Sequence, residues 1–200
     1  MNPNVIERYD RQMKLWGQHG QAKCSSSKIC LINADSLGLE ILRGLCLAGI
    51  GSFTILDSHK FTNDDIGSSF IHQFDVGKSR GESSKAMLLD INEEALCELH
   101  SLESHLPHVS SYIQQSSDQN LLDDDSIQRQ FFWRQFDCVI ASGNLYMSQI
   151  DQLSRICWAN NIPLIRCRSI GFYGYFKNQL KQYTVEDTHP EWRPRNWDPK

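Results

Sequence analysis

The sequence predicts an α/β fold, a doubly wound and mainly parallel sheet with helices on both faces. Four short apolar runs, at residues 28–33, 52–57, 136–142 and 162–167, have the length and character of buried strands. Segments with apolar residues at helical spacing alternate with these runs, an order that builds parallel sheets. Residues 28–45 also form a strand, a tight turn and a helix, which is how nucleotide-binding α/β domains usually begin.

The helix after the first strand carries an apolar stripe of Leu37, Ile41 and Leu45. Gly49 and Gly51 end this helix as its C-cap and turn residues, and the second strand follows at once. The crossover between the two strands is therefore short, and we expect the strands to be parallel.

A polar stretch over residues 58–81 follows the second strand and is too irregular for a regular element. We expect a loop that large apolar side chains pin to the core, namely Phe61, Ile66, Phe70, Ile71 and Phe74. A helix is then predicted from about Lys78 to about Leu99, with Gly81 and Asn92 as weak points.

The second half of the chain continues the alternation. A weak strand at 108–115 and a helical segment at 131–136 precede the third clear strand, and a helix at 146–161 precedes the fourth. From Ser169 the pattern changes to glycines among aromatics, which suggests a strand that crosses elsewhere or a mixed edge. The last residues, 187–200, hold three of the six prolines and two tryptophans, and predict an extended tail.

Composition bounds the class of protein. The 200 residues are 40% hydrophobic and 22% charged, enough for one sizeable core. A net charge of -4 without a basic stripe argues against nucleic acid as a partner. No apolar window has the length of a signal peptide or a membrane helix, so we expect no membrane association and a cytoplasmic or nuclear location.

Cysteine and histidine patterns point to no catalytic or metal residue. The seven cysteines are an odd number without a C-x-x-C pair, which favours neither a disulfide framework nor a zinc site. Cys24 lies in a polar segment and is the one candidate for an exposed thiol, with a catalytic role the less favoured interpretation. His100, His105 and His108 are close in sequence, but Pro107 favours a loop over a metal site.

The turn after the first strand departs from the phosphate-binding fingerprint G-x-G-x-x-G. Its three glycine positions correspond to Asn33, Asp35 and Gly38, so only the glycine for helix packing is kept. Asp35 places a carboxylate where a helix N-terminus would bind an anion, and its oxygen can cap the backbone N–H groups instead. We therefore predict a self-capped helix rather than a bound triphosphate. Asp57, at the end of the second strand, is either a ribose-binding acid or a turn former, and the sequence favours neither.

Several motifs in order resemble the adenylation domains of ubiquitin-like activating enzymes. They are "RYDRQMKLWG", "ICLIN", "GLEILRGLCLAGIGSFTILD", "DVGKSRGES", "IPLIRCRSIGFYGY" and "THP". Within that family the chain is most similar to the catalytically inactive, regulatory subunits that serve neddylation, and second to those that serve SUMO. The resemblance implies a Rossmann-like adenylation domain that pairs with a catalytic subunit. That subunit binds ATP and magnesium, adenylates the ubiquitin-like modifier and passes it to a cysteine as a thioester.

This chain lacks further residues that the active members of this family have. The stretch after the second strand, "DDIGSSFIHQ", lacks the arginine that grips phosphate, and the magnesium-binding Asp falls near Ser142 and Gly143. Lys78 remains, either as part of the half-site or as a surface lysine at a helix start. The resemblance thus implies a degenerate nucleotide half-site of Asn33, Asp35, Gly38, Asp57 and Lys78. No cofactor is expected on this chain, and ATP and magnesium are expected in the partner subunit.

The resemblance also implies one role in trans. Arg11 matches the arginine that reaches across the dimer in this family to the ATP phosphates of the active subunit. The alternative for Arg11 is a salt bridge with Asp10 or Glu7 on an exposed helix.

The family's regulatory subunits are longer, so the chain resembles a short isoform or a fragment. We expect an inactive adenylation-type domain at residues 1–184, with an N-terminal helix at 8–24, and a tail or the start of a missing region at 185–200. A truncated binding module that occupies the catalytic partner without supporting catalysis, and an independent nucleotide-binding enzyme, are the alternative functions.

Overall fold

A six-stranded sheet forms the centre of the molecule. The computed structural model describes residues 7–66, 71–107 and 131–183. The strands lie in the order β3-β2-β1-β4-β5-β6, and every pairing is parallel except that of β5 with β6. This order is that of a doubly wound nucleotide-binding fold, which confirms the predicted fold class. The strands are β1 (Lys28–Ile32), β2 (Ser52–Leu56), β3 (Leu96–His100), β4 (Cys138–Ser142), β5 (Leu164–Ile170) and β6 (Tyr173–Gln179).

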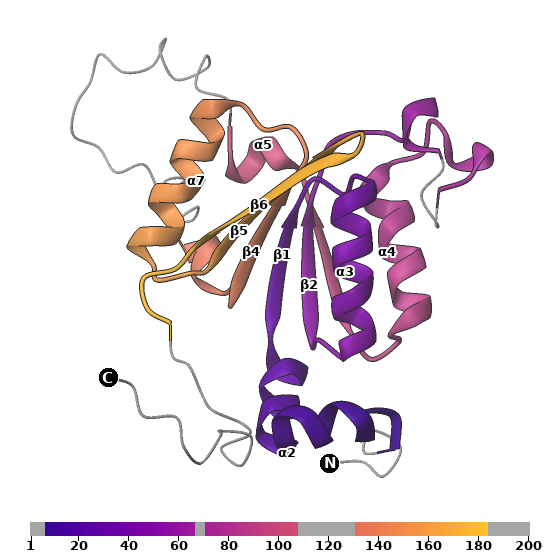
Figure 1. Ribbon diagram of the computed structural model, residues 1–200. Helices are drawn as coiled ribbons and strands as arrows, with labels where there is room; N and C mark the ends of the chain where they lie inside the picture. The colour runs from indigo at the N-terminus through magenta and orange to yellow at the C-terminus, as the bar shows by residue number, and fades with distance from the viewer. Residues whose placement is uncertain (1–6, 67–70, 108–130, 184–200) are drawn as a thin grey trace.

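Helices cover both faces of this sheet (Figure 1). Helices α3 (Ser36–Ala48) and α4 (Arg80–Ile91) pack on one face, and α5 (Leu102–His105) and α7 (Met147–Ala159) pack on the other. Two short 3-10 turns, η1 (Asn63–Asp65) and η2 (Gln73–Asp75), lie in the connection between β2 and α4. The two sides of the sheet thus bury two separate apolar clusters.

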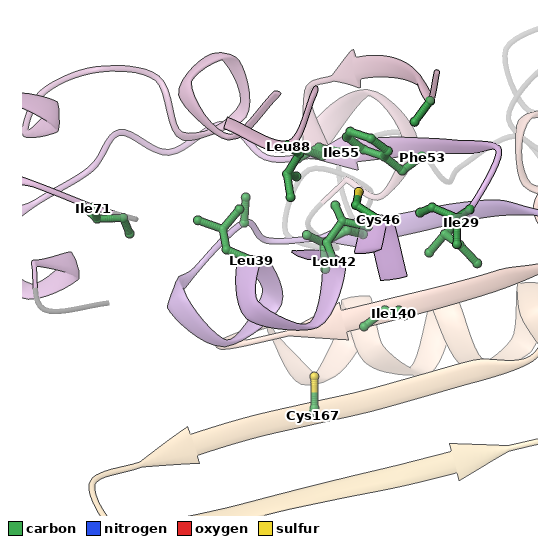
Figure 2. Close-up of a cluster of buried hydrophobic side chains, with 14 of the residues drawn as sticks. Ile29, Leu39, Leu42, Cys46, Phe53, Ile55, Ile71, Leu88, Ile140 and Cys167 are labelled. Carbon is green, nitrogen blue, oxygen red and sulfur yellow. The ribbon is translucent and has the colours of Figure 1, made fainter. Parts of the chain in front are cut away.

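The first cluster joins the sheet to α3 and α4 (Figure 2). Helix α3 buries Leu39, Leu42 and Cys46 in it. The predicted stripe of Leu37, Ile41 and Leu45 is only half-buried and packs against the margin of the cluster. The prediction missed the central face because α3 is apolar over more than half of its circumference, so two neighbouring stripes match the helical period. Phe61 and Ile71 are buried and pin the 58–81 connection as expected, whereas Ile66 and Phe74 are exposed and Phe70 lies outside the described residues.

The predicted helix from Lys78 to Leu99 is wrong in its second half. Helix α4 ends at Ile91, and Asn92 caps it while its side chain donates to the backbone oxygens of Cys46 and Ile50. Residues 96–100 form the parallel strand β3 at one edge of the sheet. The predicted strand at 108–115 and the tail at 187–200 lie outside the described residues.

The N-terminal helix α2 (Asp10–Ser26) lies at the amino ends of the strands, below the sheet in Figure 1. It is kinked at Gly17 and docks on the end of α3, where Gln21 Nε2 donates to the backbone oxygen of Ala48 at 3.1 Å. Tyr9 packs against Gly49, the left-handed C-cap of α3, so closely that a Cβ there would lie 2.6 Å from its ring. Helix α2 is therefore fixed at the end of the molecule opposite the carboxyl ends of the strands.

Candidate functional site

The turn after β1 is tied to the end of β4. Asn33 has φ 63°, a left-handed conformation that Asn tolerates better than most residues. Its Nδ2 donates to the backbone oxygen of Ser142 at 2.9 Å and to that of Asn144 at 3.4 Å, while its Oδ1 is buried without a partner among the described residues. The first fingerprint position therefore holds a side chain that connects two strands.

Asp35 closes the N-terminus of α3 with its own carboxylate. As the N-cap residue, it accepts a hydrogen bond at Oδ1 from the backbone N–H of Gly38 at 2.8 Å. Ser142 Oγ donates to the same oxygen at 2.5 Å. The predicted self-cap is confirmed, and its second donor comes from the end of β4, 107 residues further along the chain.

Two glycines allow these close approaches. A Cβ on Gly38 would lie 2.6 Å from the backbone oxygen of Asn33, so no larger residue fits between the turn and the helix. Gly143 has φ 69°, and a Cβ there would lie 2.5 Å from Oδ2 of Asp35. The glycine kept for packing has the role predicted for it, and Gly143 makes room for the Asp35 carboxylate.

The side chain of Asp57 is fully buried at the carboxyl end of β2 and is hydrogen-bonded within the chain. Its Oδ2 accepts from the backbone N–H of Ala34 at 2.8 Å, and its Oδ1 accepts from that of His59 at 2.7 Å. The guanidinium of Arg80 lies 3.9 Å from Oδ2. These bonds give Asp57 a role in holding the two strand ends together. Ribose binding by Asp57 stays a prediction.

Arg80, which the sequence did not single out, lies between two carboxylates at the start of α4. Its Nη2 donates to Oδ1 of Asp65 at 2.5 Å, and its Nε is buried without a partner among the described residues. Burial acts to raise the pKa of Asp65, but hydrogen bonds from Thr62 and Arg80 outweigh it and hold that pKa below its usual range. Arg80 thus neutralises acidic groups of its own chain.

A cavity of about 470 Å³ lies at the carboxyl ends of β1 and β4, where ligands bind in folds of this class. Its polar lining includes Asn33, Asp35, His59, Arg80, Asn144 and Arg168. Of the predicted half-site residues, Asn33 and Asp35 line this cavity. Asp57 and Gly38 lie behind the lining, where Asp57 accepts from the backbone N–H of Ala34 and Gly38 packs against the backbone of Asn33. Lys78 is not part of the lining.

Lys78 is engaged elsewhere. Its Nζ donates to Oδ1 of Asp75 at 3.0 Å and lies 5.0 Å from the centre of the Phe74 ring. This geometry is that of a half-exposed surface lysine, the second of the two interpretations that the sequence allowed. Any nucleotide role for Lys78 stays a prediction.

Arg11 lies on α2, at the opposite end of the molecule from this cavity. It is exposed, and within the described ranges it forms no hydrogen bond or ion pair. The alternative salt bridge with Asp10 is not seen, because Asp10 pairs with Lys14 at 2.6 Å. Arg11 is therefore placed where it cannot serve this chain's own half-site.

Thiol chemistry finds no support in the described residues. Burial raises the pKa of Cys46, Cys97 and Cys157 to about 12 and that of Cys138 to about 11, and it also raises the pKa of Cys24. In the described part of the chain, no three His, Cys, Asp or Glu side chains are arranged to hold a metal. Nor does any helix there have the length and apolar character to cross a membrane.

Comparison with known proteins identifies relatives in sequence and in fold. NEDD8-activating enzyme E1 regulatory subunits of Gallus gallus and Xenopus laevis are 36% and 37% identical to the chain over 186 residues. The aligned part is 92% of this chain and 31% of each relative, so the chain spans about a third of the length of these curated relatives. Among solved structures, E. coli MccB with MccA superposes with a TM-score of 0.66 at 19% identity, over 90% of this chain and 50% of that one.

The resemblance to regulatory subunits for neddylation is thereby confirmed, while the likeness to MccB concerns the fold alone. The ThiF family model matches residues 9–188, which include every described strand and the whole cavity. The chain belongs to the ThiF family.

Proposed function

We propose that this chain is a non-catalytic regulatory subunit, or a part of one, of an activating enzyme for a NEDD8-type modifier. It pairs with a catalytic subunit that adenylates the ubiquitin-like modifier with ATP and then forms the thioester. Its similarity to NEDD8-activating enzyme E1 regulatory subunits supports this function. The proposed location is the cytoplasm, the nucleus or both.

The observation that carries the proposal is the closed N-terminus of α3. A phosphate group placed there would compete with the Asp35 carboxylate, which already accepts from Gly38 and Ser142. Two negative charges about 4 Å apart repel by roughly 1 kcal/mol in water and about 4 kcal/mol near a protein surface. The helix N-terminus that could bind an anion is thus used by the chain itself.

ATP and magnesium do not fit the residues around this turn. The position expected for a magnesium-binding Asp falls at Ser142 and Gly143. Ser142 is bonded to Asp35, and Gly143 leaves no room for a Cβ beside that carboxylate. This chain therefore holds neither ATP nor magnesium in our proposal, and both belong to the catalytic subunit.

Arg11 is the residue that this chain contributes to the partner's reaction. A guanidinium offers a planar set of N–H donors that matches phosphate oxygens, and the exposed side chain of Arg11 is engaged by no described residue. At the partner's ATP it would stabilise the charge that develops during adenylyl transfer. Its role is to position and to neutralise the phosphates in trans.

Modifier-dependent ATP–pyrophosphate exchange by the catalytic subunit of a NEDD8-activating enzyme tests this proposal. We expect exchange to require this chain and to fall about 10- to 100-fold with Arg11→Ala, because a charged hydrogen bond contributes about 1.5–3 kcal/mol. Arg11→Lys keeps the charge without the planar donor set, so it should restore only part of the rate. Lys23→Ala removes another exposed cation of α2 and should leave exchange unchanged.

Three outcomes would contradict the proposal. ATP–pyrophosphate exchange that proceeds without this chain would contradict its regulatory role. ATP–pyrophosphate exchange that is unaffected by Arg11→Ala would contradict the role of Arg11 at the partner's ATP. Stable binding to the catalytic subunit without any exchange would instead favour the alternative, a binding module that occupies the partner.

A further inference from the structure

Helix α2 consists of two segments that meet at a kink. Gly17 has φ 73° and ψ 173°, a conformation that is almost exclusive to glycine, and it separates residues 10–16 from residues 18–26 (Figure 1). A Cβ on Gly17 would meet no atom within 4 Å, so glycine is required there by the backbone conformation and not by lack of space. We name residues 10–16, which include Arg11, the Arg11 segment, and residues 18–26 the anchor segment.

Gln21 fastens the anchor segment to the rest of the molecule. Its side chain is fully buried, and its Nε2 donates to the backbone oxygen of Ala48 at 3.1 Å. Ala48 is the last residue of α3, where backbone oxygens lack a partner within the helix. Cys24 Sγ donates to the same oxygen at 3.4 Å. The anchor segment is therefore held on the C-terminal end of α3.

The amide of Gln21 also joins the two segments of α2. Nε1 of Trp16, the last residue of the Arg11 segment, donates to Oε1 of Gln21 at 3.1 Å. The Trp16 ring packs so closely on Gly20 that a Cβ there would lie 2.7 Å from Cδ1 of the ring. An indole N–H can only donate and a backbone oxygen can only accept, so both are satisfied by an amide, which accepts from one and donates to the other. Gln21 thus fixes the angle between the two segments.

The other end of the Arg11 segment is fixed as well. Tyr9, which precedes it, is buried against the left-handed C-cap of α3. Arg8 Nη2 donates to the backbone oxygen of Ile91 at 2.8 Å, at the end of α4. Because Gln21 holds Trp16 at the opposite end, the Arg11 segment is attached at both of its ends to the C-terminal ends of the two helices.

The position of Arg11 depends on these attachments. The Arg11 side chain is exposed and forms no hydrogen bond or ion pair within the described ranges, so the backbone that carries it determines where the guanidinium lies. Misplacement of a reacting or charge-stabilising group by about 1 Å can lower a rate on the order of 100-fold. A segment that is ordered before the subunits meet also avoids the cost of ordering it on binding.

We propose that Gly17 and Gln21 are positioning residues for the reaction in trans. Gly17 sets the direction of the Arg11 segment. Gln21 holds that direction through its bonds to Trp16 and Ala48. The inference rests on the proposed function and adds to it the means by which this chain orients Arg11 towards the partner's ATP.

A double-mutant cycle on modifier-dependent ATP–pyrophosphate exchange, with the catalytic subunit of a NEDD8-activating enzyme saturated by the chain, tests this role. Gln21→Met keeps a side chain of similar size but removes both hydrogen bonds, so exchange should fall about tenfold. In the Arg11→Ala background the same substitution should change exchange by less than about twofold, because Gln21 acts through Arg11. Gln18→Met is the matched control on the exposed face of the same segment and should leave exchange unchanged.

Two further variants test the kink and the bond across it. Gly17→Ala places a strained residue at the kink without a steric clash, and exchange should again fall about tenfold. Gly77→Ala is its control, since Gly77 also has a positive φ and free space around it but lies outside α2, and exchange should be unchanged. Trp16→Phe keeps an aromatic ring without the N–H donor, so it should reproduce part of the loss caused by Gln21→Met.

Thermal unfolding shows that each variant is folded at the temperature of the assay, and Trp16→Phe decides the test if Gln21→Met is not. The inference is overturned if Arg11→Ala lowers exchange while Gln21→Met and Gly17→Ala do not. It is also overturned if Gln21→Met lowers exchange by the same factor with and without Arg11, because its role is then structural only. A wild-type chain that does not stimulate exchange, or exchange that is unaffected by Arg11→Ala, contradicts the proposed function itself.

Discussion

The turn after β1 and the hairpin of β5 and β6 use their polar groups in opposite ways. Around the turn, Asp35, Asp57 and Asp65 each accept hydrogen bonds from their own chain at 2.5–3.0 Å. On the hairpin, Arg168 and Lys177 are unpaired in the described part of the chain, and aromatic rings face the solvent. The comparison indicates that the polar groups around the turn are used by the chain itself, where related folds bind ligands, while those of the hairpin face the solvent.

This difference has a physical basis. A buried charge needs a partner, and the chain or a ligand can supply it. Where Ser142 and Gly38 supply the partners of Asp35, a phosphate gains little by replacing them. The cations of the hairpin are solvated by water, so they need no partner within the chain.

The largest expected effect on stability lies at the closed turn. Gly38→Ala places a Cβ 2.6 Å from the backbone oxygen of Asn33, which neither element can relieve without shifting. We expect the free energy of unfolding to fall by about 2–3 kcal/mol, as in other overpacked sites. Urea denaturation followed by circular dichroism measures this loss.

Gly44→Ala is the matched control on the same helix. A Cβ at Gly44 meets no atom within 4 Å, and alanine favours a helix interior over glycine by about 1 kcal/mol. This variant should therefore be more stable than the wild type. Equal effects of the two substitutions would show that the turn is not tightly packed, and would contradict the closed turn that we describe.

A smaller effect is expected at the Arg80–Asp65 pair, and it depends on pH. The pKa of Asp65 is lowered in the folded state, so its contribution to stability is complete above the unfolded value of about 4 and is lost as pH falls through the folded value. Asp65→Asn should lower the free energy of unfolding by about 1–2 kcal/mol at pH 7. The difference from the wild type should shrink towards pH 2.

Chemical denaturation at a series of pH values measures this difference. Lys14→Ala, which breaks the exposed pair with Asp10 on α2, should change stability by less than about 0.5 kcal/mol at each pH. A gap between wild type and Asp65→Asn that stays constant from pH 7 to pH 2 would contradict the ionised Asp65 that we describe.

Much of the fold could be predicted because its central strands are continuous apolar runs. Such runs predict the strands β1, β2, β4 and β5, and apolar residues at helical spacing predict the helices α3 and α7. Strand β3 was missed because it lies at an edge and is only half-buried, and its two leucines, Leu96 and Leu99, match helical spacing. The asparagine at residue 92 that ends α4 was noted only as a weak point, because its side-chain bonds to Cys46 and Ile50 depend on tertiary contact.

The candidate site could be predicted only where it follows a local motif. The spacing of the fingerprint pointed to Asn33, Asp35 and Gly38, and the capping bond of Asp35 spans three residues. Arg80 and Arg168 were not found, because they reach the cavity from α4 and β5, and no local pattern connects these elements to the turn. A correct strand order would have been needed to place them at the same sheet edge.

Whether the α3 N-terminus is closed to phosphate is tested most directly by isothermal titration calorimetry with magnesium–ATP. The chain alone should give no saturable heat, while its complex with the catalytic subunit should bind one ATP per pair, more weakly with Arg11→Ala. A one-site isotherm from the chain alone would contradict the closed half-site and place the nucleotide on this subunit.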